Sequence, residues 1–187
     1  MATTSLGSWK SLGLLWTGVH AITWALAMLA PGFVHGSTDT TEILGLIAAG
    51  CLIGAGEWLV LSRRVPISGW WMIGFGLGWV VALKVSGSRG FFAPDVLWLG
   101  CGGGVLVGAQ MWLALRRHVT RAATWLPVFV ASSLLGTWIG EVAGFKYYDL
   151  TNNEGVAYLI GGACVGAAIG LLSSVPLTRM LKVRAEF

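Results

Sequence analysis

The chain repeats itself: GAGEWLVLSRRV at residues 54–65 returns as GAQMWLALRRHV at residues 108–119, and seven of the twelve aligned positions are identical. Each stretch ends an apolar segment of about 20 residues, the length that a helix needs to cross a membrane. The sequence GGACVGAAIGLLSS at residues 161–174 follows the second stretch more weakly, at an offset of 58 residues. These matches predict three helical hairpins of about 55 residues each, at approximately 11–65, 68–119 and 124–178.

The composition of the whole chain is that of a membrane protein. Of the 187 residues, 56% are hydrophobic and only 11% are charged, and the mean hydropathy is +0.76. Soluble domains carry about 25% charged residues, because a fold in water needs polar side chains to cover its surface. We therefore predict an all-α integral membrane protein, with a single membrane domain over residues 1–187. Its six transmembrane helices are expected at roughly 11–30, 42–62, 68–86, 94–115, 124–144 and 154–177.

The lysines and arginines predict how these helices are oriented. With a cytoplasmic N-terminus, nine of them fall on the cytoplasmic side and three on the outer side. Cytoplasmic loops of membrane proteins are rich in Lys and Arg, so this distribution indicates a multi-pass protein of the cell membrane with both termini cytoplasmic. The net charge of +4 then belongs to loops at a membrane and does not indicate a nucleic-acid surface. Trp70, Trp71 and Trp125 follow arginine-rich turns and are expected to form an aromatic belt at the cytoplasmic interface.

The hairpins predict approximate threefold symmetry. Each repeat holds two helices, so all three repeats have the same orientation and are related by an axis along the membrane normal. The first helices of the hairpins also align if Trp24, Trp79 and Trp138 are equivalent, at offsets of 55 and 59 residues.

Glycines four residues apart recur in the second, fourth and sixth helices. Four-residue spacing places them on one face of each helix, where small residues let two helix backbones approach closely in a membrane. We predict that these faces pack helices together; the alternative is a narrow conduit lined by backbone. The glycines concerned are Gly50, Gly54, Gly104, Gly108, Gly162 and Gly166.

Four ionisable residues fall inside the apolar segments and are the candidate binding or gating residues: His20, Glu57, Lys84 and Glu141. Each costs about 2.5–3.5 kcal/mol to insert at membrane depth, so each requires an explanation. Lys84 and Glu141 are expected at similar depth near the outer ends of their helices, either as an ion pair at an outer gate or with both side chains reaching the surface. His20 is either a hydrogen-bonded core residue or a metal or haem ligand, and the first interpretation is favoured because no second histidine falls at a suitable depth.

Glu57 is expected to have a cationic neighbour in Arg63, Arg64 or Arg117. A structural role and a functional role both remain open for this carboxylate. Its equivalent in the second repeat is Met111 and in the third Ile169, so the position does not form a ring of three acids. No metal-binding or catalytic motif accompanies it, and the sequence indicates no particular cofactor.

The motifs GEWLVLSRRV, MWLALRRHV and GGACVGAAIGLLSS together resemble a group of uncharacterised bacterial, cyanobacterial-type membrane proteins rich in Trp and Gly. Those six-helix proteins carry QWLVLRR-like repeats, and the likeness extends over about residues 45–175. The resemblance implies the six-helix fold and implies no activity. Here Glu57 stands where that group has a glutamine.

Two functions remain open from the sequence. The first is a membrane protein that binds or transports a small solute or ion, which gives the intramembrane charges a role. The second is a non-catalytic structural or assembly subunit of a larger membrane complex. A complex that contains pigments or lipids is one form of this alternative. The expected surroundings are the lipid bilayer, with a membrane-protein partner or a second copy of the chain as further contacts. An enzyme is not expected, because the sequence has no paired carboxylates and no HExxH, GxSxG or Walker motif.

Overall fold

The computed structural model describes residues 9–30, 40–86, 96–119 and 121–185, and at several helix ends it describes the backbone alone. These residues form six α-helices and one short 3-10 helix, with no strand among them. The elements are α1 (Trp9–Ala27), α3 (Thr40–Leu61), α4 (Trp70–Ser86), α5 (Val96–Leu115), η1 (Ala122–Thr124), α6 (Trp125–Thr151) and α7 (Glu154–Ala185). The all-α prediction is confirmed, and each of the six predicted segments overlaps one of the helices.

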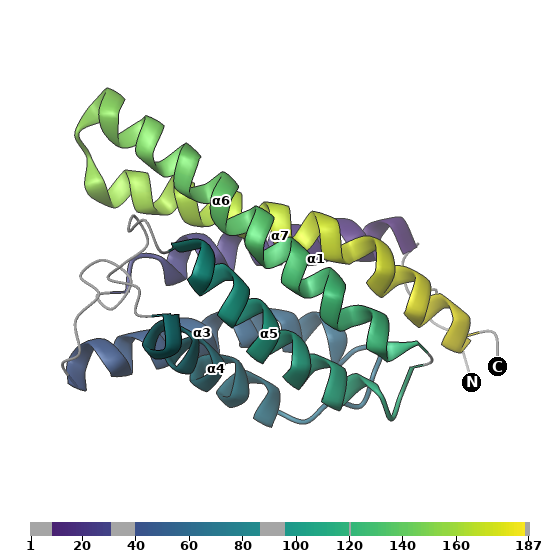
Figure 1. Ribbon diagram of the computed structural model, residues 1–187. Coiled ribbons are helices and arrows are strands. Elements are labelled where there is room, and N and C mark those ends of the chain that lie inside the picture. Colours follow the sequence, from purple (N-terminus) through teal and green to yellow (C-terminus); the bar gives the residue numbers. More distant parts are fainter. Residues whose placement is uncertain (1–8, 31–39, 87–95, 120, 186–187) are drawn as a thin grey trace.

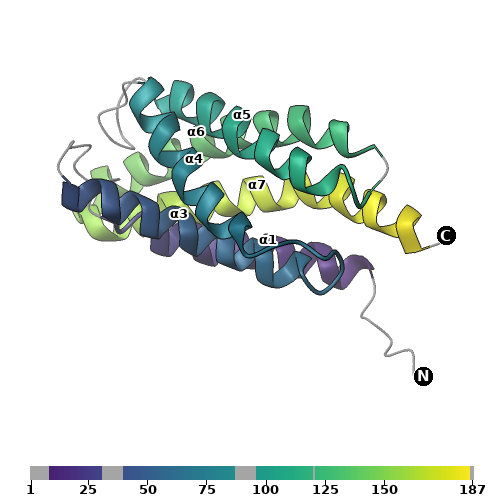
Figure 2. The same cartoon turned by 90° about the horizontal axis from the view of Figure 1, so that it is seen from below.

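The six helices form a closed ring. Each helix packs against its neighbours in the chain, and α7 packs against both α6 and α1, which closes the ring. Figures 1 and 2 show that α1 begins and α7 ends at the same end of the bundle, where the α3–α4 and α5–α6 turns also lie. The arginines of those turns therefore gather at one end, and the α6–α7 hairpin lies at the other end.

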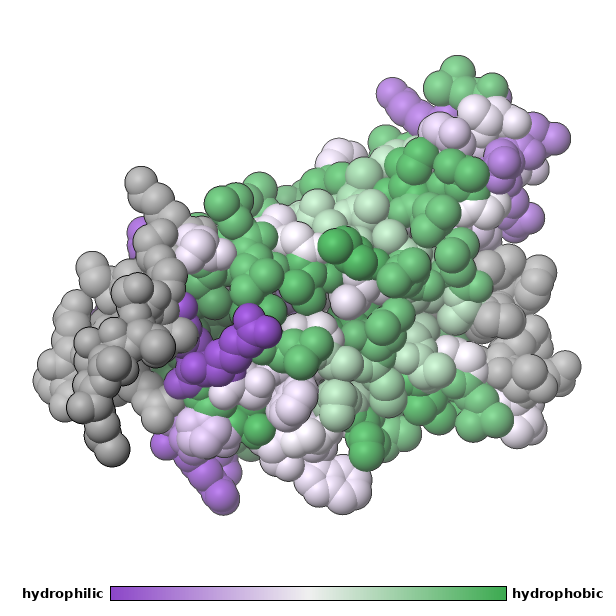
Figure 3. Space-filling view, turned by 180° about the vertical axis from the view of Figure 1, so that it is seen from behind, coloured by the Kyte–Doolittle hydropathy of each residue, from purple (hydrophilic) through white to green (hydrophobic). Residues whose placement is uncertain are grey.

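Three helices are long and apolar enough to cross a membrane: Ile43–Leu61, Ala122–Thr151 and Glu154–Leu181. Three shorter apolar helices accompany them within the described residues, Ser11–Ala27, Trp70–Ala82 and Gly100–Leu115. Figure 3 shows one face of the bundle, where hydrophobic side chains cover the middle and hydrophilic ones gather toward the two ends. These features are those of a membrane protein, because an apolar band must face the lipid.

The last two helices extend beyond the predicted ends. The prediction ended them near residues 144 and 177, but α6 continues to Thr151 and α7 to Ala185. Two asparagines make the tight connection between them. Asn152 adopts a left-handed backbone (φ 50°) that ends α6, and the side chain of Asn153 accepts a hydrogen bond from the backbone N–H of Val156 in the first turn of α7. Figure 1 shows this hairpin projecting past the other helices.

Glycines lie at the crossings of α3 with α4, α5 with α6 and α7 with α1. A Cβ atom on Gly50 would lie 2.6 Å from the Cα of Gly76, and one on Gly104 would lie 2.9 Å from the Cα of Val130. On α7, a Cβ atom on Gly162 would lie 2.6 Å from the carbonyl oxygen of Trp24. Gly54, Gly108 and Gly166 face the same three partner helices one turn further along. Close packing through these faces places the backbones of the paired helices in direct contact.

Candidate functional site

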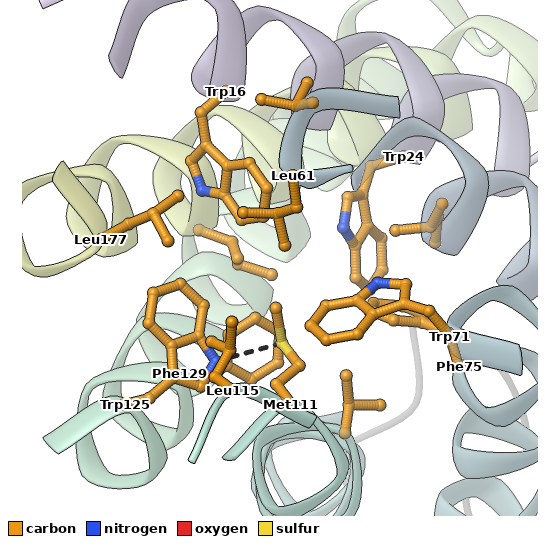
Figure 4. Close-up of a cluster of buried hydrophobic side chains, with 14 of the residues drawn as sticks. Trp16, Trp24, Leu61, Trp71, Phe75, Met111, Leu115, Trp125, Phe129 and Leu177 are labelled. Atoms are coloured by element: carbon orange, nitrogen blue, oxygen red, sulfur yellow. Dashed lines mark hydrogen bonds between the residues drawn. The ribbon is translucent and has the colours of Figure 1, made fainter. Parts of the chain in front are cut away.

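One tryptophan from each of α1, α4 and α6 lies in the middle of the ring, and its indole N–H donates to a side chain of an adjacent helix. The bonds run from Trp16 Nε1 to Ser173 Oγ (2.9 Å), from Trp71 Nε1 to Glu57 Oε2 (3.2 Å) and from Trp125 Nε1 to Met111 Sδ (3.1 Å). All three indoles are buried, as Figure 4 shows around the dashed Trp125–Met111 bond. The acceptors are a hydroxyl, a carboxylate and a thioether, so one of the three places holds an ionisable group.

That ionisable group is Glu57, and its partner is His20. Nε2 of His20, on α1, lies 2.8 Å from Oε1 of Glu57, on α3. Both side chains are buried, at 1% and 0% exposed. A charge in the membrane interior is costly unless an opposite charge and hydrogen bonds accompany it, and this carboxylate has His20 on one oxygen and the Trp71 N–H on the other.

The backbone determines which nitrogen of His20 carries a hydrogen. Nδ1 lies 3.0 Å from the carbonyl oxygen of Trp16, one turn earlier in α1. A carbonyl oxygen only accepts hydrogen bonds, so Nδ1 is the donor and keeps its hydrogen. Nε2 then faces Oε1 of Glu57 across 2.8 Å. A proton held between these two atoms would leave the pair without net charge, either as imidazolium with carboxylate or as imidazole with carboxylic acid.

Neighbouring helices enclose the pair on several sides. The Trp16 ring lies 4.5 Å from the His20 ring, centroid to centroid. On the α7 side, Gly166 lies so close that a Cβ atom there would meet the backbone carbonyl of His20. The pair is therefore surrounded by residues of four helices, α1, α3, α4 and α7.

Positions related by the repeat lack this polarity. Phe75 and Phe129 lie 55 and then 54 residues after His20, and both are buried at 1% exposure or less. Met111 and Ile169 occupy the positions equivalent to Glu57, and both are fully buried. At the spacings of the predicted repeat, the chain thus carries buried apolar residues in place of His20 and Glu57.

The predicted cationic neighbours of Glu57 are wrong. Arg63, Arg64 and Arg117 belong to the turns at the end of the bundle, whereas Glu57 lies in α3 and pairs with His20. The reason is helix rotation: the carboxylate points into the ring toward α1, away from the arginine-rich turns. His20 and Glu57 are separate candidates in the sequence, and the structure brings them together.

The predicted tryptophan belt is also wrong for two of its three members. Trp70 is 74% exposed, but Trp71 and Trp125 are buried, and their N–H groups bond to Glu57 and Met111. A signal for this arrangement was present in the sequence. Trp71 follows Glu57 by 14 residues, and Trp125 follows Met111 by the same 14 residues.

Glu141, a further candidate from the sequence, is not part of this site. Glu141 lies on α6 with a partly exposed side chain. The side chain of Lys84 lies outside the described residues, so the expected pairing with Glu141 stays a prediction. Within the described ranges, no three His, Cys, Asp or Glu side chains are grouped to hold a metal ion.

Substitution of Ser173 tests the hydrogen bond that it accepts from Trp16. We expect Ser173→Ala to lower the free energy of unfolding by about 1–3 kcal/mol, because the buried Trp16 N–H loses its acceptor. Ser174→Ala is the matched control, since that hydroxyl bonds to the carbonyl of Leu171 in its own helix. Unfolding midpoints in detergent micelles compare the two. Equal midpoints would contradict the bond between Trp16 and Ser173.

Comparison of this chain with protein-family models, with curated proteins and with solved structures finds no match.

Proposed function

We propose that all six helices span a membrane as three pairs related by approximate threefold symmetry, with both termini and the arginine-rich turns cytoplasmic. The arrangement is supported by the burial of equivalent positions. Trp16, Trp71 and Trp125 recur at intervals of 55 and 54 residues, and all three are buried. Trp138 is 52% exposed, unlike Trp24 and Trp79, so the offset of 59 that makes these three equivalent does not describe the interior.

The same pairing of helices supports this symmetry. The helices that contribute the three indoles are α1, α4 and α6, and their acceptors lie on α7, α3 and α5. The glycine crossings join the same pairs. We therefore propose that each repeating unit pairs a helix that carries the acceptor with a helix that carries the tryptophan. In the pairs α3–α4 and α5–α6 the two helices follow each other in the chain, whereas α7 and α1 come from opposite ends of the chain and pack together.

We further propose that the protein binds or transports a small solute or ion, with His20 and Glu57 as its polar centre. The observation that carries this proposal is the fully buried contact of 2.8 Å between them, in a bundle whose equivalent positions are apolar. Phenylalanine and methionine fill these positions elsewhere in the ring, so packing alone does not require an ionisable pair. A pair that stores one proton can release it to a passing solute or exchange it for a cation.

The alternative function is a structural or assembly subunit of a larger membrane complex. It is favoured by one observation: indoles fill the middle of the ring, and large apolar side chains such as Trp98 and Trp138 are exposed on its outside. In that case His20 and Glu57 would fix the packing of α1 against α3, and the outer face would contact other subunits.

Native mass spectrometry of gently extracted protein separates the two functions. We expect a stoichiometric non-lipid ligand or a bound cation on the wild-type chain, and its loss in the double variant His20→Phe, Glu57→Met. The variant places at each position the residue found at an equivalent one, so its fold is expected to persist. Co-purifying protein subunits without any such ligand, in wild type and variant alike, would instead support the assembly subunit.

A further inference from the structure

The turn between α5 and α6 encloses a second polar feature, separate from the His20–Glu57 pair. A pocket of about 500 Å³ opens there, lined by the last turn of α5, the connecting residues and η1. Its polar side chains are Arg116, Arg117, His118 and Arg121, and no acidic residue lines it.

Two of the arginines of this turn make contacts within the described residues. Arg121 adopts a left-handed conformation (φ 59°), and its carbonyl oxygen accepts hydrogen bonds from both the backbone N–H and the hydroxyl of Thr124. The guanidinium of Arg116 lies 5.6 Å from the ring centroid of Trp112, a cation–π contact that orients it. These contacts position the Arg121 carbonyl and the Arg116 guanidinium beside the pocket.

The positive charges of the pocket are not neutralised within the described part of the chain. No described carboxylate forms a salt bridge with Arg116, Arg117 or Arg121. Three arginines line this pocket, and an anion bound among them would reduce the repulsion between their positive charges. A phosphate group fits this chemistry best, because the planar guanidinium donates two parallel hydrogen bonds to its oxygens.

The equivalent turn between α3 and α4 provides a comparison. Arg63 occupies the position equivalent to Arg117, at the repeat offset of 54 residues. Ser62 and Ile67 occupy the positions equivalent to Arg116 and Arg121. Arg116 and Arg121 therefore have no arginine at the equivalent positions of the α3–α4 turn.

We propose that this pocket binds a phosphate group, that of an anionic phospholipid headgroup or of a free phosphate. A headgroup is the better-placed source, because the pocket lies at one end of the apolar band, where α5 ends. The inference does not depend on the function proposed for His20 and Glu57.

Binding measurements on delipidated full-length protein test the proposal, with phosphatidylglycerol, phosphatidylcholine and inorganic phosphate as the three probes. Native mass spectrometry reports the number of lipids retained from mixed micelles, and calorimetry reports binding of phosphate. We expect retention of phosphatidylglycerol over phosphatidylcholine, weakened at least about fivefold in Arg117→Gln, the effect of losing one basic contact. Arg63→Gln removes the same charge from the equivalent position and is expected to leave retention unchanged.

Other outcomes would either change the source of the phosphate or overturn the proposal. Binding of inorganic phosphate that Arg117→Gln weakens, without any lipid preference, would support the pocket with a soluble ligand as its source. Equal losses in Arg63→Gln and Arg117→Gln would overturn it, because the effect would then follow net charge and not the pocket. Absence of both lipid preference and phosphate binding in the wild type would also overturn it. Both arginines are exposed, so unchanged unfolding midpoints are expected to accompany every result.

Discussion

Replacing His20 by Phe and Glu57 by Met together is expected to leave the free energy of unfolding within about 1 kcal/mol of the wild-type value, or to raise it. Either substitution alone is expected to lower it by about 3–5 kcal/mol, because the remaining polar group is then buried without its partner. The sulfur introduced by Glu57→Met would still accept the N–H of Trp71, as Met111 accepts that of Trp125 at 3.1 Å. The side chains change little in volume, so the apolar pair fits the same space.

Reversible unfolding in mixed detergent micelles, followed by circular dichroism, measures all four proteins in one thermodynamic cycle. A coupling free energy of several kcal/mol between the two substitutions is the expected sign of a pair that acts as a unit. If the double variant is as unstable as the two losses added together, the coupling free energy is zero, and His20 and Glu57 contribute to stability independently and not as a pair. If the double variant is stable but has lost the ligand of the wild type, the pair is retained for function.

The positions of the helices could be predicted from sequence, but the partner of Glu57 could not. Helix positions follow from runs of apolar residues, which are a local property of the chain. The contact between His20 and Glu57 joins residues that are 37 positions apart, and it depends on how α1 and α3 rotate about their axes. Up to Gly56, α3 is apolar on nearly all sides after its first turn, so it gives no amphipathic pattern from which its rotation can be read.

The tryptophans show the same limit. An indole next to an arginine-rich turn is typical of a membrane interface, and that rule fits Trp70, which is exposed. Trp71 is the next residue, about 100° further round the helix, and there it is buried and donates its N–H to an acceptor inside the ring. The repeat carries the information that the general rule lacks, because equal spacing from Glu57 to Trp71 and from Met111 to Trp125 indicates one shared contact.

Replacing Gly166 by Leu is expected to have the other large effect, a loss of about 3 kcal/mol in the free energy of unfolding. A Cβ atom at this position would meet the backbone carbonyl of His20 and would lie 2.8 Å from the Cβ of Trp24. These are main-chain atoms and the base of a large side chain, so a leucine fits only if α7 moves away from α1. That movement would displace His20, and we expect the variant to lose the ligand of the wild type as well as stability.

Gly18→Leu is the matched control, because Gly18 lies on α1 with no atom within 4 Å of a Cβ placed there. Leucine is a better helix former than glycine by about 1 kcal/mol, so this variant is expected to be as stable as the wild type or more stable. The same unfolding measurement in micelles compares the two leucines. Equal stabilities would show that α7 does not pack closely on α1, and the ring would then be open at that pair. A loss of stability confined to Gly166→Leu would show that α7 packs closely on α1 at His20. The glycine face of α7 would then help to hold the candidate site as well as the fold.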